Sequence, residues 1–422
     1  MPTLRIFGSI SKQHQRLGYL KWLIKKVAST PTSNLDNLGN GLIDVVTRKE
    51  SAKLTAERVQ YIRIRLFDAV YKTIKDQADS WQKNGGEPPV VQMEIQDLYL
   101  ADPTLPSQVG KLVREDWRFY PNLGTNLGLI RAGTYSINTR AFTLLYLTGE
   151  QELRAFVEYL PDVNPLKISP KQRMLFLYCL LENDGEVILP FYRAIISYQM
   201  ANFNDREAGN LLPDIYRHVI KHYRTGDLPY DIRERLVSLE KTAENIAAQS
   251  LKERYAGGTS REHSSRPRLE PFVDIGFLTK PNPMKYEYNL SPVAERWIAA
   301  YEGPETSAGI EAFLDRQFFR AAAAAWQIEA TPLSTPEEIV PRLRKAAKAI
   351  SSSSGYTPIE EMALLAGIEA LLDDGRTFEI ATAREALIAY QKANPYHVRF
   401  TVNRMGVLAH AKFMDEAPPR SS

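Results

Sequence analysis

One pair of histidines in this chain has a spacing that could bind a metal ion. Two of its six histidines, His218 and His222, are four residues apart, a spacing that puts both side chains on one face of a helix. The residues between them are Val, Ile and Lys, so no acid completes a zinc-protease motif. The neighbouring Arg217, Lys221 and Arg224 indicate an exposed polar helix face instead. We therefore expect no metal and no other cofactor.

Nucleophile and phosphate-binding motifs are also missing from the sequence. The single cysteine, Cys179, lies in the apolar run 174–181 and is expected to be a core residue. No P-loop, no dinucleotide-binding glycine motif and no GxSxG motif occurs. Asp274 with Lys280 or Lys285 superficially resembles the acid–lysine pattern of metal-dependent nucleases, and a nuclease is kept as an alternative. The main expectation is a protein without its own catalytic centre.

Basic residues gather at the N-terminal end. Residues 1–75 hold 14 Lys or Arg against 5 Asp or Glu, a net charge of +9, whereas the whole chain carries +3. Such a segment on a nearly neutral protein is typical of nucleic-acid binding, although a solvated basic surface has the same composition. Arg58, Arg65 and Lys72 are seven residues apart in a helical pattern and share one face, so they are candidate DNA contacts.

The elements that position these residues are mostly helical. Helices are expected at 17–28, 54–81, 169–183 and 231–255, and residues 305–416 form a largely helical part. The composition, 44% hydrophobic and 24% charged, is that of a folded globular protein. The first residues lack an apolar core of signal-peptide length, and no stretch approaches the ~20 apolar residues of a membrane span. We therefore expect a cytoplasmic protein.

Two stretches repeat one plan of helix, glycine turn, strand, polar excursion, strand and helix. In the second stretch the turn surrounds Gly276, and Ser291-Pro292 starts the last helix. The glycine permits a close turn from helix to strand. The segments of the second stretch are 266–273, 274–278, 279–285, 286–290 and 293–301, and those of the first are 127–130, 131–134, 135–138 and 139–147.

This plan resembles winged-helix domains. In such a domain one helix lies in the ~12 Å major groove, and the tip of the hairpin, the wing, reaches the backbone or the minor groove. The resemblance implies a groove helix at about 259–272 in the second unit and at 107–118 in the first. The DNA contacts that it implies for the second unit are Arg261, His263, Ser264, Ser265, Arg266 and Arg268 on the helix and Lys280 and Lys285 on the wing. Those that it implies for the first are Lys111, Arg114 and Arg118 on the helix and Arg131, Thr134 and Arg140 on the wing.

The predicted fold is mainly α with small antiparallel β wings, as tandem winged-helix units joined by helical segments. The expected parts are a basic helical region at 1–85, a first unit at 90–160, a second unit with a helical insertion at 165–302 and a helical domain at 305–416. Within the last part, the helix–strand–helix–strand pattern at 357–402 fits a third winged-helix-like unit and a plain helical bundle equally well.

The architecture is similar to that of multi-winged-helix proteins from bacterial restriction and anti-phage defence loci, over about 90–150 and 169–301. This similarity implies a non-enzymatic protein that binds double-stranded DNA, as a specificity or accessory subunit of a protein partner that supplies the chemistry. A replication or transcription factor would have the same pattern. The main alternative is a structural adaptor whose winged helices bind protein, as in the accessory subunits of SMC complexes.

Overall fold

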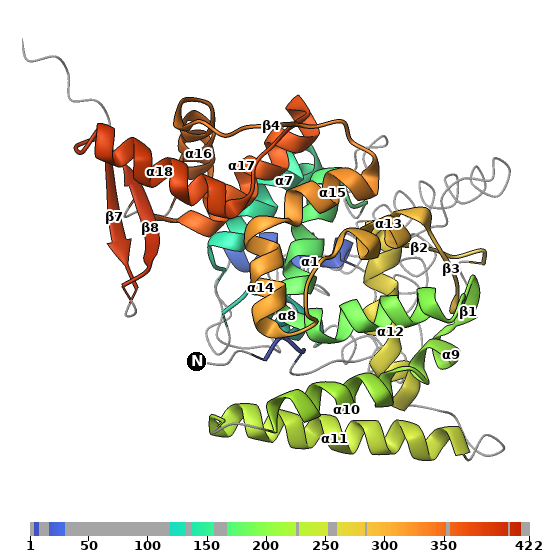
Figure 1. The fold of residues 1–422 in the computed structure, drawn as a ribbon. Coiled ribbons are helices and arrows are strands. Elements are labelled where there is room, and N and C mark those ends of the chain that lie inside the picture. The colour runs from blue at the N-terminus through green and yellow to red at the C-terminus, as the bar shows by residue number, and fades with distance from the viewer. Residues whose placement is uncertain are drawn as a thin grey trace, which may run out of the picture.

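The computed structural model describes residues 4–7, 17–29, 119–131, 137–155, 167–224, 228–251, 260–282, 285–351, 355–403 and 406–414. These parts of the chain are mainly helical, with small and mostly antiparallel sheets (Figure 1). The expected fold class is confirmed at this level. Among the described helices, none is long and apolar enough to cross a membrane. The helices expected at 54–81 and 107–118 lie outside the described residues.

The N-terminal helices lie beside each other. Helix α1 (Gly18–Ser29) contacts both α6 (Phe119–Asn126) and α7 (Thr139–Ala155). Between α6 and α7, an isolated antiparallel bridge joins Ile130 to Ile137. The bridge brings together the two ends of the segment that was expected to form the first hairpin. The helix directly before this segment is α6, not the helix expected at 107–118.

Helix α8 (Pro170–Ser197) is the centre of the molecule and is buried along most of its length. It begins with a capping box, in which Ser169 and Gln172 bond each other's backbone N–H groups, and with Pro170 in its first turn. The backbone of α8 departs from helical geometry at Asp184, where φ is −137°. The side-chain carboxylate of Asp184 is buried and accepts a hydrogen bond from the backbone N–H of Phe7 at 3.0 Å.

A three-stranded antiparallel sheet follows α8, with the strand order β1-β3-β2. In this sheet Phe203 pairs with Tyr288, and Leu278 pairs with Leu290. Four helices, α9 to α12, separate the first strand from the other two in sequence, and α10 and α11 contact each other. The elements are β1 (Asn202–Asn204), α9 (Asp205–Gly209), α10 (Leu212–Tyr223), α11 (Tyr230–Leu251), α12 (Ser260–Ile275), β2 (Leu278–Thr279), β3 (Glu287–Leu290) and α13 (Pro292–Ala300).

The turns after α6 and α12 have the same backbone structure. Gly128 and Gly276 have φ angles of 66° and 91°, which favour glycine. In each turn the next residue, Leu129 or Phe277, donates its N–H to a carbonyl five residues earlier, at 2.8 and 2.9 Å respectively. This is the hydrogen bond of a Schellman helix end, and it satisfies carbonyls that the helix leaves unpaired.

The helices after the two hairpins also begin alike. Ser291 donates its hydroxyl to the Gly276 carbonyl at 2.7 Å and accepts the N–H of Ala294. Asn138 donates to the Gly128 carbonyl and accepts the equivalent N–H at the start of α7. Each cap thus ties the start of one helix to the end of another across a hairpin. The two stretches therefore share the glycine turn and the capped start of the next helix, whereas in the first stretch the described residues form a single bridge in place of two paired strands.

Aromatic side chains join α13 to the next two helices. The buried Trp297 lies edge-on to Phe313 and Phe318, with ring centroids 5.6 and 5.7 Å apart. Gly367 on α17 lets the ring of Phe319 approach, because a Cβ there would lie 2.3 Å from the ring. The bounds of these helices are α14 (Ser307–Arg316), α15 (Phe318–Trp326) and α17 (Ile359–Asp374).

The C-terminal part contains a second three-stranded antiparallel sheet, with the order β5-β8-β7, beside three mutually contacting helices. A short parallel pair, β4 with β6, lies nearby in sequence. The helix–strand pattern expected at 357–402 is found, and a hairpin extends it. The elements are β4 (Thr331–Pro332), α16 (Pro336–Ile350), β5 (Thr357–Pro358), β6 (Arg376–Thr377), α18 (Ile380–Ala393), β7 (Val398–Val402) and β8 (Leu408–Phe413).

Candidate functional site

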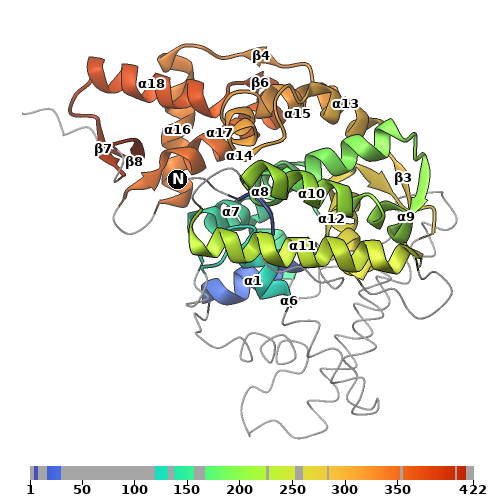
Figure 2. The ribbon, with the colours of Figure 1, turned by 60° about the horizontal axis from the view of Figure 1, so that its bottom comes forward.

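The predicted groove helix of the second unit corresponds to α12, and its polar side chains do not face solvent. Arg261 is 7% exposed, Ser265 is fully buried and Arg268 is 1% exposed. Helices α8, α9 and α11 contact α12, and Figure 2 shows α11 lying across it. The expectation of a solvent-facing helix is therefore wrong. The physical reason is that α8, α9 and α11 pack around α12 and bury its polar side chains.

Arg268 belongs to a buried network. Its guanidinium donates to both carboxylate oxygens of Asp184 at 2.7 and 2.9 Å and to the Tyr216 hydroxyl at 3.0 Å. Burial raises the pKa of Asp184, and the charge of Arg268 opposes that rise. Arg268 thus holds α12 to α8 and α10 and is not available to a ligand.

The other polar residues of α12 are engaged as well. Arg266 donates to Asp205 at 2.5 Å and lies 3.5 Å from the centroid of the Tyr286 ring. Arg261 donates to Asn210 at 3.0 Å. His263 is half-buried, and Ser264 is buried with its carbonyl accepting from Arg268. These contacts bind α12 to α9 and to the hairpin.

The predicted wing of the second unit keeps one cation at the surface. Lys280 is 4% exposed and donates to Glu270 at 2.9 Å, and the hydroxyl of Tyr288 donates to the same carboxylate at 2.6 Å. Lys285 has a side chain that is 60% exposed and lies 3.5 Å from Glu287. Of the two predicted wing lysines, Lys285 alone could meet a phosphate in this conformation.

The candidates of the first unit and of the N-terminal region are placed only in part. Arg131 is exposed, and Arg140 is 7% exposed. The prediction that Arg140 contacts DNA conflicts with its burial among carboxylates. The remaining candidates, Lys111, Arg114, Arg118, Thr134, Arg58, Arg65 and Lys72, lie outside the described residues.

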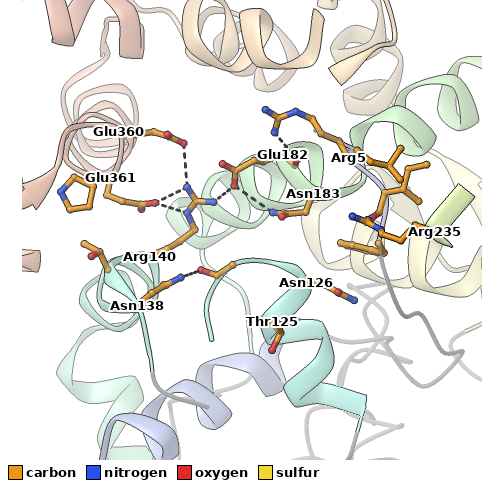
Figure 3. Close-up of a pocket in the computed structure, with 16 residues that line it drawn as sticks. Arg5, Thr125, Asn126, Asn138, Arg140, Glu182, Asn183, Arg235, Glu360 and Glu361 are labelled. Carbon is orange, nitrogen blue, oxygen red and sulfur yellow. Dashed lines mark hydrogen bonds and ion pairs between the residues drawn. The ribbon is translucent and has the colours of Figure 1, made fainter. Parts of the chain in front are cut away.

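Arg140 lies at the edge of a pocket of about 820 Å³ (Figure 3). Three glutamates surround its guanidinium: Glu182, Glu361 with contacts of 2.6 and 2.7 Å, and Glu360 at 3.3 Å. Arg140 belongs to α7, Glu182 to α8, and Glu360 and Glu361 to α17. The arginine therefore connects the three parts of the chain that meet at this pocket.

One carboxylate of the pocket, that of Glu361, is poorly solvated, with 9% of its side chain exposed. Burial raises the pKa of Glu361, and Arg140 opposes the rise. Burial also raises the pKa of the neighbouring Cys179 thiol to about 12. Arg5 and Arg235, which also line the pocket, donate to main-chain carbonyls of Glu182 and Ile6. Each of these three arginines already has a partner within the protein. The arrangement therefore indicates that the residues hold the helices together and do not bind a further ligand.

Within the described ranges, no three His, Cys, Asp or Glu side chains are grouped so that they could hold a metal ion. His218 and His222 are both on the exposed side of α10, with Arg217 and Lys221. Both histidines therefore lie on the exposed polar helix face that the sequence predicted.

A basic face that the sequence-based candidates did not include lies on the C-terminal hairpin, β7 and β8. Arg399 is directly opposite Lys412, and Thr401 is opposite His410. No Asp or Glu occurs anywhere from residue 386 to residue 414. This acid-free stretch, together with the alternation of Arg399 and Thr401 with Val398 and Phe400, is a sequence signal that could have identified the face.

No protein-family model, no curated protein and no solved structure matches this chain.

Proposed function

We propose that this protein binds double-stranded DNA, using winged-helix-like units held in one assembly. The observation that carries the proposal is the strand order of the two three-stranded sheets, β1-β3-β2 and β5-β8-β7. In both sheets the last two strands are neighbours, and the earlier strand pairs with the last one. That order is the one expected when a helix–strand–helix–helix segment is followed by a wing hairpin.

The order of elements along the chain supports this assignment. The C-terminal unit runs α16, β5, α17, β6, α18, β7 and β8, and its three helices contact one another. The central unit runs α8, β1, α9, α12, β2 and β3, with α10 and α11 inserted before α12. The group of α1, α6 and α7 shares the glycine turn and the capped following helix of the central unit. Three related units in one chain could contact successive segments of one DNA duplex.

Charge supports DNA as the ligand. The +9 of residues 1–75 and the acid-free C-terminal stretch both favour a polyanion. Because α12 is covered, Arg261, Ser265 and Arg268 are not contacts in the proposed DNA complex. The basic N-terminal region and the exposed parts of the other units provide the cations instead.

A salt titration tests the proposal. Binding of the full chain to a fluorescent duplex of arbitrary sequence is measured by anisotropy between about 50 and about 200 mM salt. We expect the logarithm of the association constant to fall linearly with the logarithm of the salt concentration, with a slope of about −0.9 per phosphate contacted. Absence of any duplex binding at the lowest salt would reject the proposal.

The second candidate function is an adaptor that binds protein. It is favoured by the apolar side chains at the end of the C-terminal hairpin, where Val402 is 59% and Val407 is 50% exposed, and by Tyr396 before it, which is 86% exposed. The two valines lie at the tip of the hairpin and Tyr396 lies near the other end of β7, and exposed apolar groups of this kind often mark protein contacts. The same titration separates the two functions, because the adaptor predicts no affinity for the duplex at any salt concentration.

A further inference from the structure

We infer that the N-terminal segment, Leu4–Phe7, is held in a peptide-binding site between α8, α11 and α14, and that it leaves this site while the rest of the protein stays folded. The inference goes beyond DNA binding and does not depend on it. Figure 1 shows the dark blue N-terminal end of the chain against α8. The residues that hold the segment are Glu182, Asp184 and Glu186 of α8, Arg235 of α11 and Ser307 of α14.

The backbone of the N-terminal segment is bonded to residues far along the chain. Arg5 donates its N–H to the carboxylate of Glu186 at 2.7 Å and accepts the N–H of the same residue at 3.3 Å. The N–H of Phe7 donates to the carboxylate of Asp184 at 3.0 Å. These partners lie 181 and 177 positions further along the chain. Hydrogen bonds to both the N–H and the C=O groups of a short segment are also the means by which proteins bind separate peptides.

The side chain of Arg5 contacts the irregular turn of α8. Its guanidinium donates to the Glu182 carbonyl at 2.7 Å and to the Ser307 hydroxyl at 3.2 Å (Figure 3). In a regular helix the Glu182 carbonyl accepts the N–H of Glu186, four residues later. Arg5 contacts both of these groups, one through its guanidinium and the other through its own carbonyl. Because groups that insert between such partners kink a helix, the segment stabilises the non-helical backbone at Asp184.

The sequence of α8 at this turn makes the segment easy to release. Asn183, Asp184 and Gly185 all have low helix propensity, so little free energy is lost when the turn is irregular and little is gained when it is regular. Gly185 also lets Ile310 of α14 approach, since a Cβ there would lie 2.9 Å from the Cδ1 atom of Ile310. Two states of α8, with and without the segment, are therefore close in free energy, which is the condition for exchange between them.

The apolar side chains of the segment anchor it only moderately. Leu4, Ile6 and Phe7 are 7%, 5% and 6% exposed. Burial of these three side chains is opposed by the conformational entropy lost when four residues are ordered, and the two contributions are of the same order. The core of α8 is different, because its long run of buried residues includes Phe176 and Leu180, which are fully buried. The segment is therefore expected to open locally, well before α8 unfolds.

Hydrogen exchange of the wild-type chain tests whether the segment leaves its site by itself. We expect the amides of Arg5 and Phe7 to exchange at least about 100-fold faster than those of Phe176 and Leu180, because local opening needs less free energy than global unfolding. Exchange of both pairs at the same rate would mean that the segment opens only with the whole molecule, and would overturn the inference.

A labelled peptide tests whether the emptied site binds a separate chain. The peptide has the sequence of residues 2–9, PTLRIFGS, and binding is measured by fluorescence anisotropy. The full chain with Ile6→Ser and Phe7→Ser keeps the site but loses two anchors of its own segment. We expect this variant to bind the peptide at least about tenfold more tightly than the wild type, because an occupied site lowers the apparent affinity in proportion to the fraction of free sites. A peptide with Arg5→Gln should bind the variant at least about tenfold more weakly, since it loses a charged donor to the Glu182 carbonyl.

The matched control is Val402→Ser with Val407→Ser, which also replaces two apolar residues by serine but at exposed positions on the C-terminal hairpin. This control keeps its own N-terminal segment and should bind the peptide no better than the wild type. Thermal unfolding shows whether each variant is folded. A folded Ile6→Ser, Phe7→Ser chain that does not bind the peptide, or that binds it only as well as the wild type does, rejects the inference. If that variant does not fold, hydrogen exchange of the wild type decides alone.

Discussion

At the scale of single residues, the charge of a side chain did not reveal its accessibility. Arg268 and Lys280 have the types expected of a DNA contact, but each forms a buried ion pair, with Asp184 and Glu270 respectively. Asp184 is 84 residues from Arg268 in the chain. Pairs of that kind depend on how distant helices meet, and no local pattern encodes them. Cys179, in contrast, lies in a continuous apolar run and is buried as expected.

Substitution of Arg268 should therefore unfold the protein before it affects any ligand. We expect Arg268→Gln to lower the free energy of unfolding by about 3–5 kcal/mol, because it leaves the buried Asp184 without its counter-charge. Denaturation with urea, followed by circular dichroism, measures the change. Lys285→Ala is the matched control. It removes an exposed lysine of the same unit, and a loss within about 1 kcal/mol is expected.

The reactivity of Cys179 tests its burial. The thiol has a pKa of about 12 and is completely buried, and burial is the main cause of the shift. At about pH 8, roughly one thiol in ten thousand would be ionised, so the native protein should react very slowly with a disulfide reagent. In denaturant the same reagent should label one thiol per chain at once. Rapid labelling of the native protein would contradict the buried placement.

At the scale of elements, the sequence located most of the described helices and strands. The expected helix at 231–255 is α11 (Tyr230–Leu251), and the expected strand at 286–290 is β3 (Glu287–Leu290). The insertion of α10 and α11 was also expected, but its position over α12 was not. The polar residues of α12 are distributed around the whole helix, so the sequence did not indicate which side would be covered. Local periodicity predicts that an element exists, whereas its neighbours come from packing.

The repeated cap is an element-scale feature whose contribution can be measured. Ser291→Ala removes both the bond to the Gly276 carbonyl and the cap of the Ala294 N–H. We expect a loss of about 1–2 kcal/mol in unfolding free energy, since a lost cap costs about 1 kcal/mol and the second bond adds a similar amount. Ser291→Asn should recover part of it, because asparagine occupies the matching position at Asn138. A Ser291→Ala variant as stable as the wild type would show that the shared turn is not held by its cap.

At the scale of the whole molecule, one arginine connects parts that the sequence treats as separate. Arg140 reaches α8 and α17 from α7, through contacts that span 42 and 221 residues. The sequence-based interpretation placed Arg140 on a wing that meets DNA. The contacts instead make it a tie between the helices α7, α8 and α17. The relative position of these helices depends on ties between residues that are far apart in the chain, and no local sequence pattern encodes such ties.

The tie at Arg140 predicts a stability that depends on pH. The pKa of Glu361 is raised by burial, so the folded protein binds a proton there more tightly than the unfolded chain does. A carboxyl group whose pKa is raised contributes stability that is fully present below its unfolded pKa, about 4.3, and that is lost as pH rises through the folded value. Arg140 limits this loss because its charge lowers the same pKa. Removal of Arg140 should therefore make the loss larger.

We expect Arg140→Gln to destabilise the protein by about 3–5 kcal/mol at about pH 8 and by clearly less at about pH 5, where the unpaired glutamates can take up protons. Glu361→Gln is the matched variant, because it resembles the protonated carboxyl and leaves Glu182 and Glu360 to pair with Arg140. It should be at least as stable as the wild type at about pH 8 and should show a flatter pH dependence. Urea denaturation of the three proteins at both pH values measures this. Equal destabilisation of Arg140→Gln at the two pH values would mean that Arg140 contributes through packing alone, and that α7, α8 and α17 are held together by other contacts.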